Sequence, residues 1–246
     1  MEENYFFTRR SCRNFKDEKI PKEEWENIIF QASKAPTCGN MQLYSVIVTQ
    51  TPANLKQLAA YHYNQPAAAT APVILTICAD FNRFTRWCDI NHADAGYDNF
   101  HSFITAMTDA VIFAQQIVTV AEMKGYSTCY LGTVTYNAKE ISELLELPEM
   151  VVPVASISIG KAEVPGEETC RLPIDAILHS EKYDKKTDEE IIKLYKVHDE
   201  DPVNEKFIKE NGKENLAQVF AEVRYPRSTN EQISESFKNL LKDKGF

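Results

Sequence analysis

Arginine, serine and amide side chains gather in four short segments of the chain, where their types and spacing could do chemistry. The first segment holds three arginines and a serine within five residues, from Arg9 to Arg13. A guanidinium is a rigid fork of donors that fits phosphate oxygens, and the Ser11 hydroxyl could complete the set. This composition indicates an anion site, although a solvated basic segment is the commoner explanation when such residues are taken alone.

Two further segments could bind a flat heteroaromatic ring. Residues 35–42 read A-P-T-C-G-N-M-Q and link a helix to a strand, so their threonine, asparagine and glutamine offer donors and acceptors on a loop. Residues 129–133 read C-Y-L-G-T, and Gly132 at the end of a strand would let a flat ligand approach the backbone. An ordinary turn and an ordinary strand-to-loop glycine remain the alternatives. In the fourth segment, Arg171 could equally form a surface ion pair.

Composition excludes several classes of protein. The 246 residues carry 36 acidic against 27 basic side chains, a net charge of −9, which disfavours binding to nucleic acids and anionic membranes. The eight glycines form neither G-x-G-x-x-G nor a P-loop. His92 and His101 lie among aspartates without a recognised metal-ligand spacing, so no metal site is predicted.

Cysteine usage and hydropathy predict the compartment. The six cysteines are scattered without a C-x-x-C pair, which is typical of reduced thiols. The N-terminal residues lack the apolar run of a signal peptide, and the longest nearly apolar run, 67–79, is too short to span a bilayer. We therefore expect a cytoplasmic protein that does not bind membranes.

Helical and strand patterns alternate through the first 160 residues. Strands are predicted at 43–49, 73–79, 126–131 and 151–159, and the second should be covered on both faces. Helices are predicted from Pro21 to about 35, from a Thr51 cap, over an apolar 103–124 that should be buried all round, and from an Asn137 capping box to about 146. This interleaving fits an α/β or an α+β fold, and periodicity does not decide between them.

A change of composition predicts two regions. Residues 1–181 should form the folded core, and 182–246, which are richer in charge, should form a helical extension that packs on the core or on a partner chain. Helices are expected near 188–197, 203–220 and 229–242, with an irregular stretch at 224–227.

Taken in order, the four segments resemble the flavin-dependent nitroreductase family. The resemblance covers about residues 5–183 and consists of R-R-S-x-R-x-F at 9–15, A-P-T-x-G-N-x-Q at 35–42, Y-L-G-T at 130–133 and R-L-P at 171–173. The first and last blocks, C-A-D-F-N-R at 78–83 and the long C-terminus are similar to the NADPH-linked branch of flavin reductase P and the major oxygen-insensitive nitroreductase.

The resemblance implies an α+β homodimer with a central, mainly antiparallel sheet flanked by helices and with two FMN molecules at the interface. On that basis one group of residues would hold the FMN phosphate and the pyrimidine side of the ring: Arg9, Arg10, Ser11, Arg13 and Arg171. Thr37 and either Asn40 or Gln42 would reach the flavin of the other subunit. The remaining contacts to the ring would come from Gln65, Tyr130, Leu131, Gly132 and Thr133.

The implied activity is a ping-pong reduction in which NADPH or NADH reduces FMN, which then passes two electrons to an electron-poor acceptor such as a nitroaromatic, a quinone or a flavin. FMN would supply the chemistry, so no catalytic side chain is predicted. Three alternatives stay open: a dehalogenase or dehydrogenase of the same fold, a flavin-binding protein without turnover, and a structural interaction protein.

Two departures from the branch affect these expectations. Thr169 stands where the branch usually has a lysine that contacts the phosphate. Residues 198–215 contain no arginine and several acids, whereas the branch keeps an arginine-rich loop there for the NADPH 2′-phosphate. The sequence therefore predicts a weak preference for NADPH over NADH.

Overall fold

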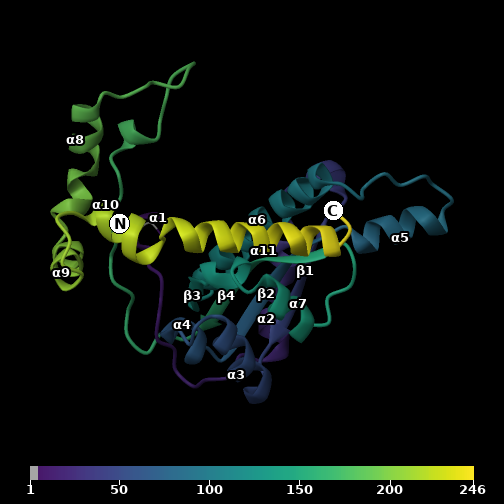
Figure 1. Ribbon diagram of the computed structural model, residues 1–246. Coiled ribbons are helices and arrows are strands. Elements are labelled where there is room, and N and C mark those ends of the chain that lie inside the picture. The colour runs from purple at the N-terminus through teal and green to yellow at the C-terminus, as the bar shows by residue number, and fades with distance from the viewer. Residues whose placement is uncertain (1–4) are drawn as a thin grey trace. The chain divides into compact units, whose positions relative to one another are not determined.

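An antiparallel sheet organises the first part of the chain in the computed structural model, which describes residues 5–246 (Figure 1). In that part of the chain four strands form the sheet in the order β1-β2-β4-β3. Their bounds are β1 (Tyr44–Thr49), β2 (Val73–Asp80), β3 (Ser127–Tyr130) and β4 (Val151–Gly160). All neighbouring strands run antiparallel, and every residue of β2 is buried. The α+β class and the double coverage of the second strand are both confirmed.

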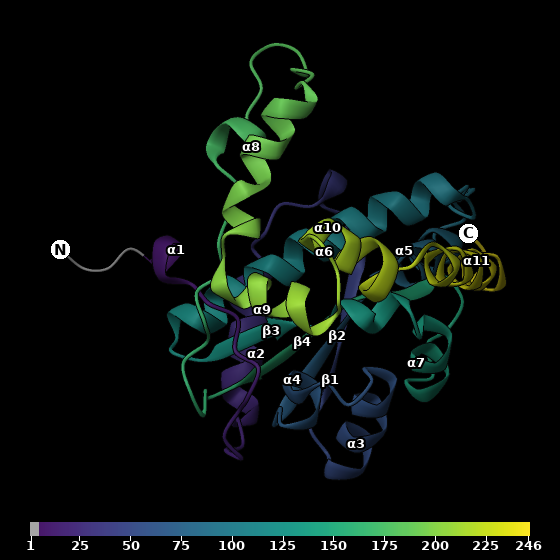
Figure 2. The same ribbon diagram turned by 60° about the vertical axis from the view of Figure 1, so that its left-hand side comes forward.

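One face of the sheet packs against α2 (Lys22–Ala32) and α6 (Phe100–Met123). Leu75 of β2 and Ile157 of β4 belong to this layer and are fully buried with Phe113 of α6. Figures 1 and 2 both place α6 on the opposite side of the strands from α3 and α4. Because successive side chains of a strand point to opposite faces, every second residue of these strands packs against the two helices.

The other face packs against α3 (Pro52–Tyr61), α4 (Pro66–Ala69) and α7 (Ala138–Leu144). Ile74, the neighbour of Leu75 on β2, lies in this second layer, because successive side chains of a strand point to opposite faces. Proline at the first position of both α3 and α4 suits the helix start, where an N–H would have no partner.

Helix α6 is long and apolar enough to cross a membrane by length and composition alone. One side of it packs on the sheet and on α2, so it is a core helix of this fold. Its other side leaves Ile104, Val111 and Ile112 between 37% and 45% exposed. Burial all round is therefore wrong for the single chain, because only one stripe of the helix meets the sheet.

The chain divides into two compact units. The first comprises the residues up to Glu167 together with Ile233–Phe246, and the second is Glu168–Gln232. Five short helical elements lie in the second unit, which also holds the first turns of α11 (Arg227–Asp243): η3 (Ile174–Ala176), α8 (Asp188–Asp199), α9 (Pro202–Glu210), α10 (Leu216–Gln218) and the π-type turn η4 (Val219–Arg224). The division expected at residue 181 stays a prediction.

One predicted helix end and two predicted side-chain caps were wrong. Helix α2 ends at Ala32, three residues early, because the Ser33 hydroxyl donates to the Phe30 carbonyl and closes the last turn. Helices α3 and α7 start where predicted, directly after Thr51 and Asn137, but neither side chain accepts a capping hydrogen bond. The Asn137 amide donates to the Tyr61 carbonyl, 2.6 Å away, so this side chain is bonded to a residue distant in the sequence.

The helix predicted at 203–220 is interrupted. Gly212 adopts a φ of +60°, which ends α9, and Asn215 then caps α10 by accepting from the Gln218 N–H. The sequence also missed the short helices α1 (Tyr5–Thr8), α4 and α5 (Asn82–Ile90) and the 3-10 turns η1 (Cys38–Asn40) and η2 (Gly132–Thr135). Four or fewer residues give no detectable periodicity, which explains all of these except α5.

Candidate functional site

The arginine segment at residues 9–13 is bonded alongside strand β3. The Cys12 N–H donates to the Thr128 carbonyl at 2.9 Å, and Cys12 is buried at 1% exposure. Its neighbours Ser11 and Arg13 are half-buried and exposed, respectively. A methyl group at Gly166 would lie 2.2 Å from the Ser11 carbonyl oxygen, so only glycine permits this approach. The backbone therefore fixes the segment while its polar side chains stay accessible.

A buried carboxylate organises the start of this segment. Glu122 of α6 accepts from the Tyr5 hydroxyl at 2.7 Å and pairs with the Arg9 guanidinium at 3.2 Å. Burial, followed by the bond to Glu122, raises the pKa of Tyr5 to about 12. A cavity of about 250 Å³ opens here, with Arg9, Arg10, Glu122 and Gly166 among its lining. Glu122 therefore compensates the charge of Arg9 and orients its guanidinium at the start of the segment.

The second predicted segment is held from its two ends by charged side chains. Buried Asp109 of α6 accepts from the Cys38 N–H at 2.9 Å and from the Leu43 N–H at 3.3 Å. Arg83 of α5 donates to the carbonyls of Gln42 at 2.7 Å and of Tyr44 at 3.1 Å. These bonds fix the backbone of the loop that carries half-buried Thr37 and exposed Asn40 and Gln42.

The positive φ angles of this loop require that support. Gly39, Asn40 and Gln42 have φ values of +55°, +56° and +55°. Glycine adopts such angles freely, but asparagine and glutamine do so at a cost. The C-A-D-F-N-R motif at 78–83 acquires a role here, because its Asp80 and Arg83 pair at 3.3 Å and Arg83 holds the loop.

The third segment presents open backbone at the end of β3. Tyr130 is 38% exposed, while Leu131 is buried and donates its N–H to the Ser156 carbonyl at 2.8 Å. Nothing lies within 4 Å of a methyl group placed on Gly132. A flat ligand could therefore approach the main chain at this glycine. The Thr133 hydroxyl lies 2.8 Å from Nδ1 of His62, which is fully buried.

Within one chain the second and third segments are far apart. Strand β1 follows the Thr37–Gln42 loop, and β3 leads into Tyr130–Thr133, yet β2 and β4 lie between these strands. Three inter-strand spacings separate them by roughly 14 Å. The structure therefore brings the arginine segment close to residues 130–133, and it keeps the loop at 37–42 apart from both.

Gln65, the remaining predicted ring contact in the first unit, caps α4 as an exposed residue. Its N–H donates to the His62 carbonyl at 3.2 Å. His62 thereby joins the Gln65 turn to the third segment. No sequence signal marked His62, Arg83 or Asp109 individually, although an aspartate within the apolar pattern 103–124 could have indicated a buried carboxylate with backbone partners.

Arg171 lies in the second unit, where its guanidinium donates to the carbonyls of Thr169 and Cys170, both at 3.0 Å, and to the Thr169 hydroxyl. Thr169 thus accepts from Arg171 at the position where a lysine was expected. The proposed contact of Arg171 with a phosphate stays a prediction, since it depends on residues of the other unit.

The lysines of α9 and the following loop face acids of the same unit. Lys206 pairs with Glu210 at 3.7 Å, Lys209 with Glu205 at 3.8 Å and Lys213 with Glu222 at 2.7 Å. Arg224 stacks over the Phe207 ring at 4.1 Å from its centroid. The three lysines therefore each have an acidic partner within the unit, whereas Arg224 contacts an aromatic ring.

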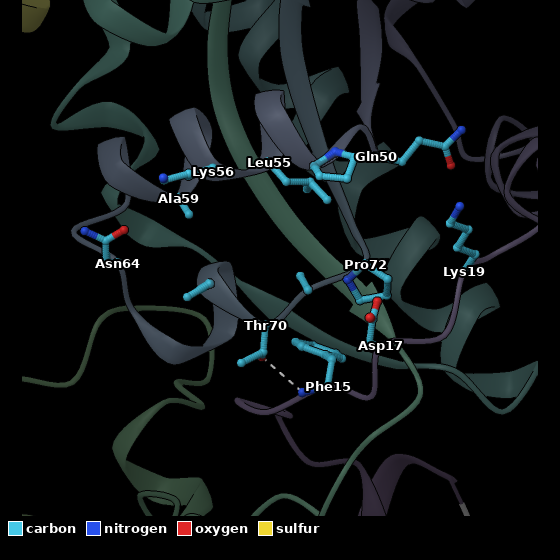
Figure 3. A pocket seen from close by; sticks show the side chains of 13 residues that line it. Phe15, Asp17, Lys19, Gln50, Leu55, Lys56, Ala59, Asn64, Thr70 and Pro72 are labelled. Atoms are coloured by element: carbon cyan, nitrogen blue, oxygen red, sulfur yellow. Dashed lines mark hydrogen bonds between the residues drawn. The ribbon is translucent and has the colours of Figure 1, made fainter.

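A separate hollow of about 550 Å³ lies in the first unit (Figure 3). Figure 3 shows Phe15 and Thr70 on one side of it, joined by the 3.1 Å bond from the Phe15 N–H, and Leu55 and Lys56 of α3 on another. Among the described residues that line it, none belongs to the predicted site. Likewise, no cluster of three or more metal-ligating side chains occurs within residues 5–246.

The profile of the Nitroreductase family matches residues 7–161 of the chain, which include the first three segments. The chain belongs to the nitroreductase family. This confirms the resemblance seen in the sequence, and with it the assignment to a family of NAD(P)H-dependent flavin oxidoreductases. Arg171 and the second unit lie outside the matched residues.

Three relatives extend the nitroreductase assignment. A CR(VI) reductase of Pseudomonas sp. (strain G-1) is 32% identical over 75% of this chain and 76% of its own length. An FMN reductase [NAD(P)H] of Bacillus subtilis (strain 168) is 29% identical and covers 96% of this chain and 94% of its own, so it includes the second unit. A crystal structure of a Bacteroides fragilis NCTC 9343 protein that carries the name oxidoreductase has a TM-score of 0.96, with 40% identity and 99% of both chains covered.

The residues of this nitroreductase fit an FMN. Guanidiniums and a serine hydroxyl are the donors that a phosphate prefers, and the arginine segment presents them next to β3. The backbone at Gly132 is open, with nothing within 4 Å of a methyl group placed there, so the edge of a flat ring could approach it. Both features lie at the β3 edge of the sheet.

Proposed function

We propose that this chain is an FMN-dependent NAD(P)H oxidoreductase that transfers two electrons to electron-poor acceptors such as nitroaromatics, quinones or free flavins. The observation that carries the proposal is the bonding of the arginine segment beside β3, where the exposed Tyr130 and the open Gly132 follow. The names of the relatives support the cofactor and the electron donor. The identity of the acceptor rests on the family alone.

Each part of the chain has a distinct task in this proposal. When bound, FMN supplies the two-electron chemistry. Ser11, the three arginines of the segment and Arg171 bind its phosphate and the pyrimidine edge, and Glu122 orients Arg9. The backbone at Tyr130–Thr133 supports the ring and Gln65 contacts its edge. A cation near the ring favours the charge that develops on reduction, which is an electrostatic contribution of this chain.

We propose a homodimer for the same reason. Thr37, Asn40 and Gln42 lie roughly 14 Å across the sheet from the β3 edge, so within one chain they stay away from the ring. The exposed apolar side chains Ile104 and Val111 of α6 would be buried against a second copy. A homodimer in the cytoplasm, without nucleic-acid or membrane partners, completes the proposal.

The test begins with protein that has been supplemented with FMN and then desalted. We expect a flavin absorbance band at about 450 nm. The band should bleach when NADPH or NADH is added anaerobically, and it should return when a nitroaromatic or quinone is added. Colourless protein would refute FMN binding. Protein that is yellow but stays oxidised with both donors would instead favour a flavin-binding protein without turnover.

A further inference from the structure

The strongest unassigned feature is His62, a buried histidine at the end of α3. Its side chain has no exposed surface, and its Nδ1 lies 2.8 Å from the Thr133 hydroxyl. The two residues are 71 positions apart in the sequence. A second bond joins the same two regions, because the Asn137 side-chain amide donates to the Tyr61 carbonyl at 2.6 Å. The end of α3 is therefore bonded directly to the segment that follows β3.

The backbone of His62 reaches a second part of the proposed site. Its carbonyl accepts from the Gln65 N–H at 3.2 Å, across a turn in which Tyr63 and Asn64 have φ values of +56° and +50°. A tyrosine in the left-handed region is uncommon and needs support from its surroundings. One residue thus contacts both the Gln65 turn and Thr133.

The chemistry of the imidazole restricts what it can do. Burial lowers the pKa of His62 to about 4, so the ring is neutral near pH 7 and has one N–H. Its Nε2 is buried and has no hydrogen-bond partner. If Nε2 carried the proton, a buried donor would be orphaned, which is rarer in proteins than an unpaired acceptor. The favoured tautomer therefore donates from Nδ1 to the Thr133 oxygen.

This tautomer determines the direction of the Thr133 hydroxyl. A threonine hydroxyl has one donor and two acceptor sites, and His62 occupies one of the acceptor sites. The hydroxyl proton is then left for an acceptor elsewhere. Thr133 is half-buried and adjoins the open backbone at Gly132, so its proton is available to a ligand on that side.

We infer that His62 is a positioning residue of the flavin site: it fixes the Gln65 turn against residues 130–133 and holds Thr133 as a hydrogen-bond donor toward FMN. This inference rests on the proposed function. It assigns no contact between His62 and the flavin, because the side chain is fully enclosed.

A double-mutant cycle measures the coupling between the two residues. FMN is titrated into apoprotein of wild type, His62→Leu, Thr133→Val and the double variant. We expect each single change to raise the Kd of FMN about tenfold, because one hydrogen bond and its alignment are lost, and the double variant to be less than about twofold weaker than either. Additive effects would overturn the inference. Gln57→Leu, at an exposed position of α3, is the matched control and should bind as wild type.

Rescue by a conservative variant separates positioning from general stability. The asparagine amide of His62→Asn can donate close to the position of Nδ1, so we expect most of the FMN affinity to return, even if unfolding shows the variant to be less stable. His62→Asn that binds as weakly as His62→Leu would overturn the inference. The unfolding of each apoprotein is measured separately, so that a loss of fold is not mistaken for a loss of affinity.

Nitrogen NMR of 15N-histidine-labelled protein tests the tautomer without any turnover. We expect one neutral imidazole that is protonated at Nδ1 and stays neutral down to about pH 5. Protonation at Nε2 would overturn the assigned direction of the Thr133 hydroxyl. If wild type binds FMN while His62→Leu binds it equally well, only the inference fails. If wild type binds no FMN, the proposed function fails and the inference fails with it.

Discussion

The two units hold their charged and polar side chains in opposite ways. In the first unit single polar groups are buried and bonded to backbone, as Asp109 is to the N–H groups of Cys38 and Leu43. In the second unit the charges of α9 pair with each other on the surface, one helical turn apart, as Lys206 does with Glu210. A buried polar group determines where a loop lies, whereas an exposed pair contributes little to stability. The comparison indicates that buried polar contacts fix the positions of loops in the first unit, whereas the surface ion pairs of α9 do not have this role in the second unit.

The largest effect should come from Asp109→Ala. The change leaves two N–H groups of the 37–43 loop without their acceptor, and we expect the free energy of unfolding to fall by about 3 kcal/mol. Urea unfolding followed by circular dichroism measures it. Asp94→Ala, at an exposed loop position, is the control and should stay within about 0.5 kcal/mol of wild type. Equal effects of the two changes would break the comparison.

His62 should make stability depend on pH. Burial lowers its pKa in the folded chain to about 4, below the ordinary histidine value of 6.5, so the unfolded chain binds the proton more readily. The stability contributed by neutral His62 is complete above about pH 6.5 and is lost as pH falls toward 4. Between pH 7.5 and 5.0 wild type should lose about 2 kcal/mol more than His62→Asn. Parallel losses in the two proteins would show that the imidazole is not desolvated.

FMN affinity tests the phosphate assignment across the two units. Arg171→Ala should weaken FMN by about 2 kcal/mol, because a charge-assisted contact is lost and Thr169 provides no replacement cation. Ser11→Ala should cost only about 1 kcal/mol, as expected for one neutral hydrogen bond. Fluorescence titration of apoprotein with FMN gives both values. Wild-type affinity in Arg171→Ala would mean that Arg171 does not contact the phosphate.

The smallest effect should appear in the choice of electron donor. Lys206, Lys209 and Lys213 each lie beside a glutamate, and a lysine is a flexible point charge without the bidentate fork of arginine, so we expect them to discriminate weakly in favour of the 2′-phosphate of NADPH. We expect the ratio of kcat/KM for NADPH over NADH to stay below about tenfold, and Lys206→Ala to change it by less than about twofold. A ratio above about a hundredfold would reveal cations that grip the phosphate, and Arg224→Ala and Arg227→Ala would be measured first.

Local patterns predicted the elements of the first unit well, because apolar periodicity directly reflects which face of an element is buried. The four strands and the long helix occur where expected, within a few residues at each end. The failures involve partners that are distant in sequence. Asn137 has the pattern of a helix cap, yet its amide bonds to Tyr61, 76 residues away. No local rule identifies a partner so distant in the sequence.

In the candidate site, too, the residues with a local sequence signal could be predicted, and those that act through distant partners could not. The exposed side chains Asn40, Gln42 and Gln65 could be proposed from motifs, since their types suit a ligand. The residues that hold the loops in place could not, because Asp109 and His62 act only through contacts across the fold. Arg83 is intermediate: its motif was noticed, and its bond to the Gln42 carbonyl came from the structure.

The strand order also has a consequence for biosynthesis. Strand β4 lies between β2 and β3, although it is the last of them to be made. Until residue 160 has left the ribosome, the mainly apolar strand β2 has β1 on one side and an unpaired edge on the other. Unpaired edges of apolar strands recruit other chains, and non-local pairing is slow. We therefore expect nascent or truncated chains that end before Val151 to aggregate, whereas the completed chain protects the same edge.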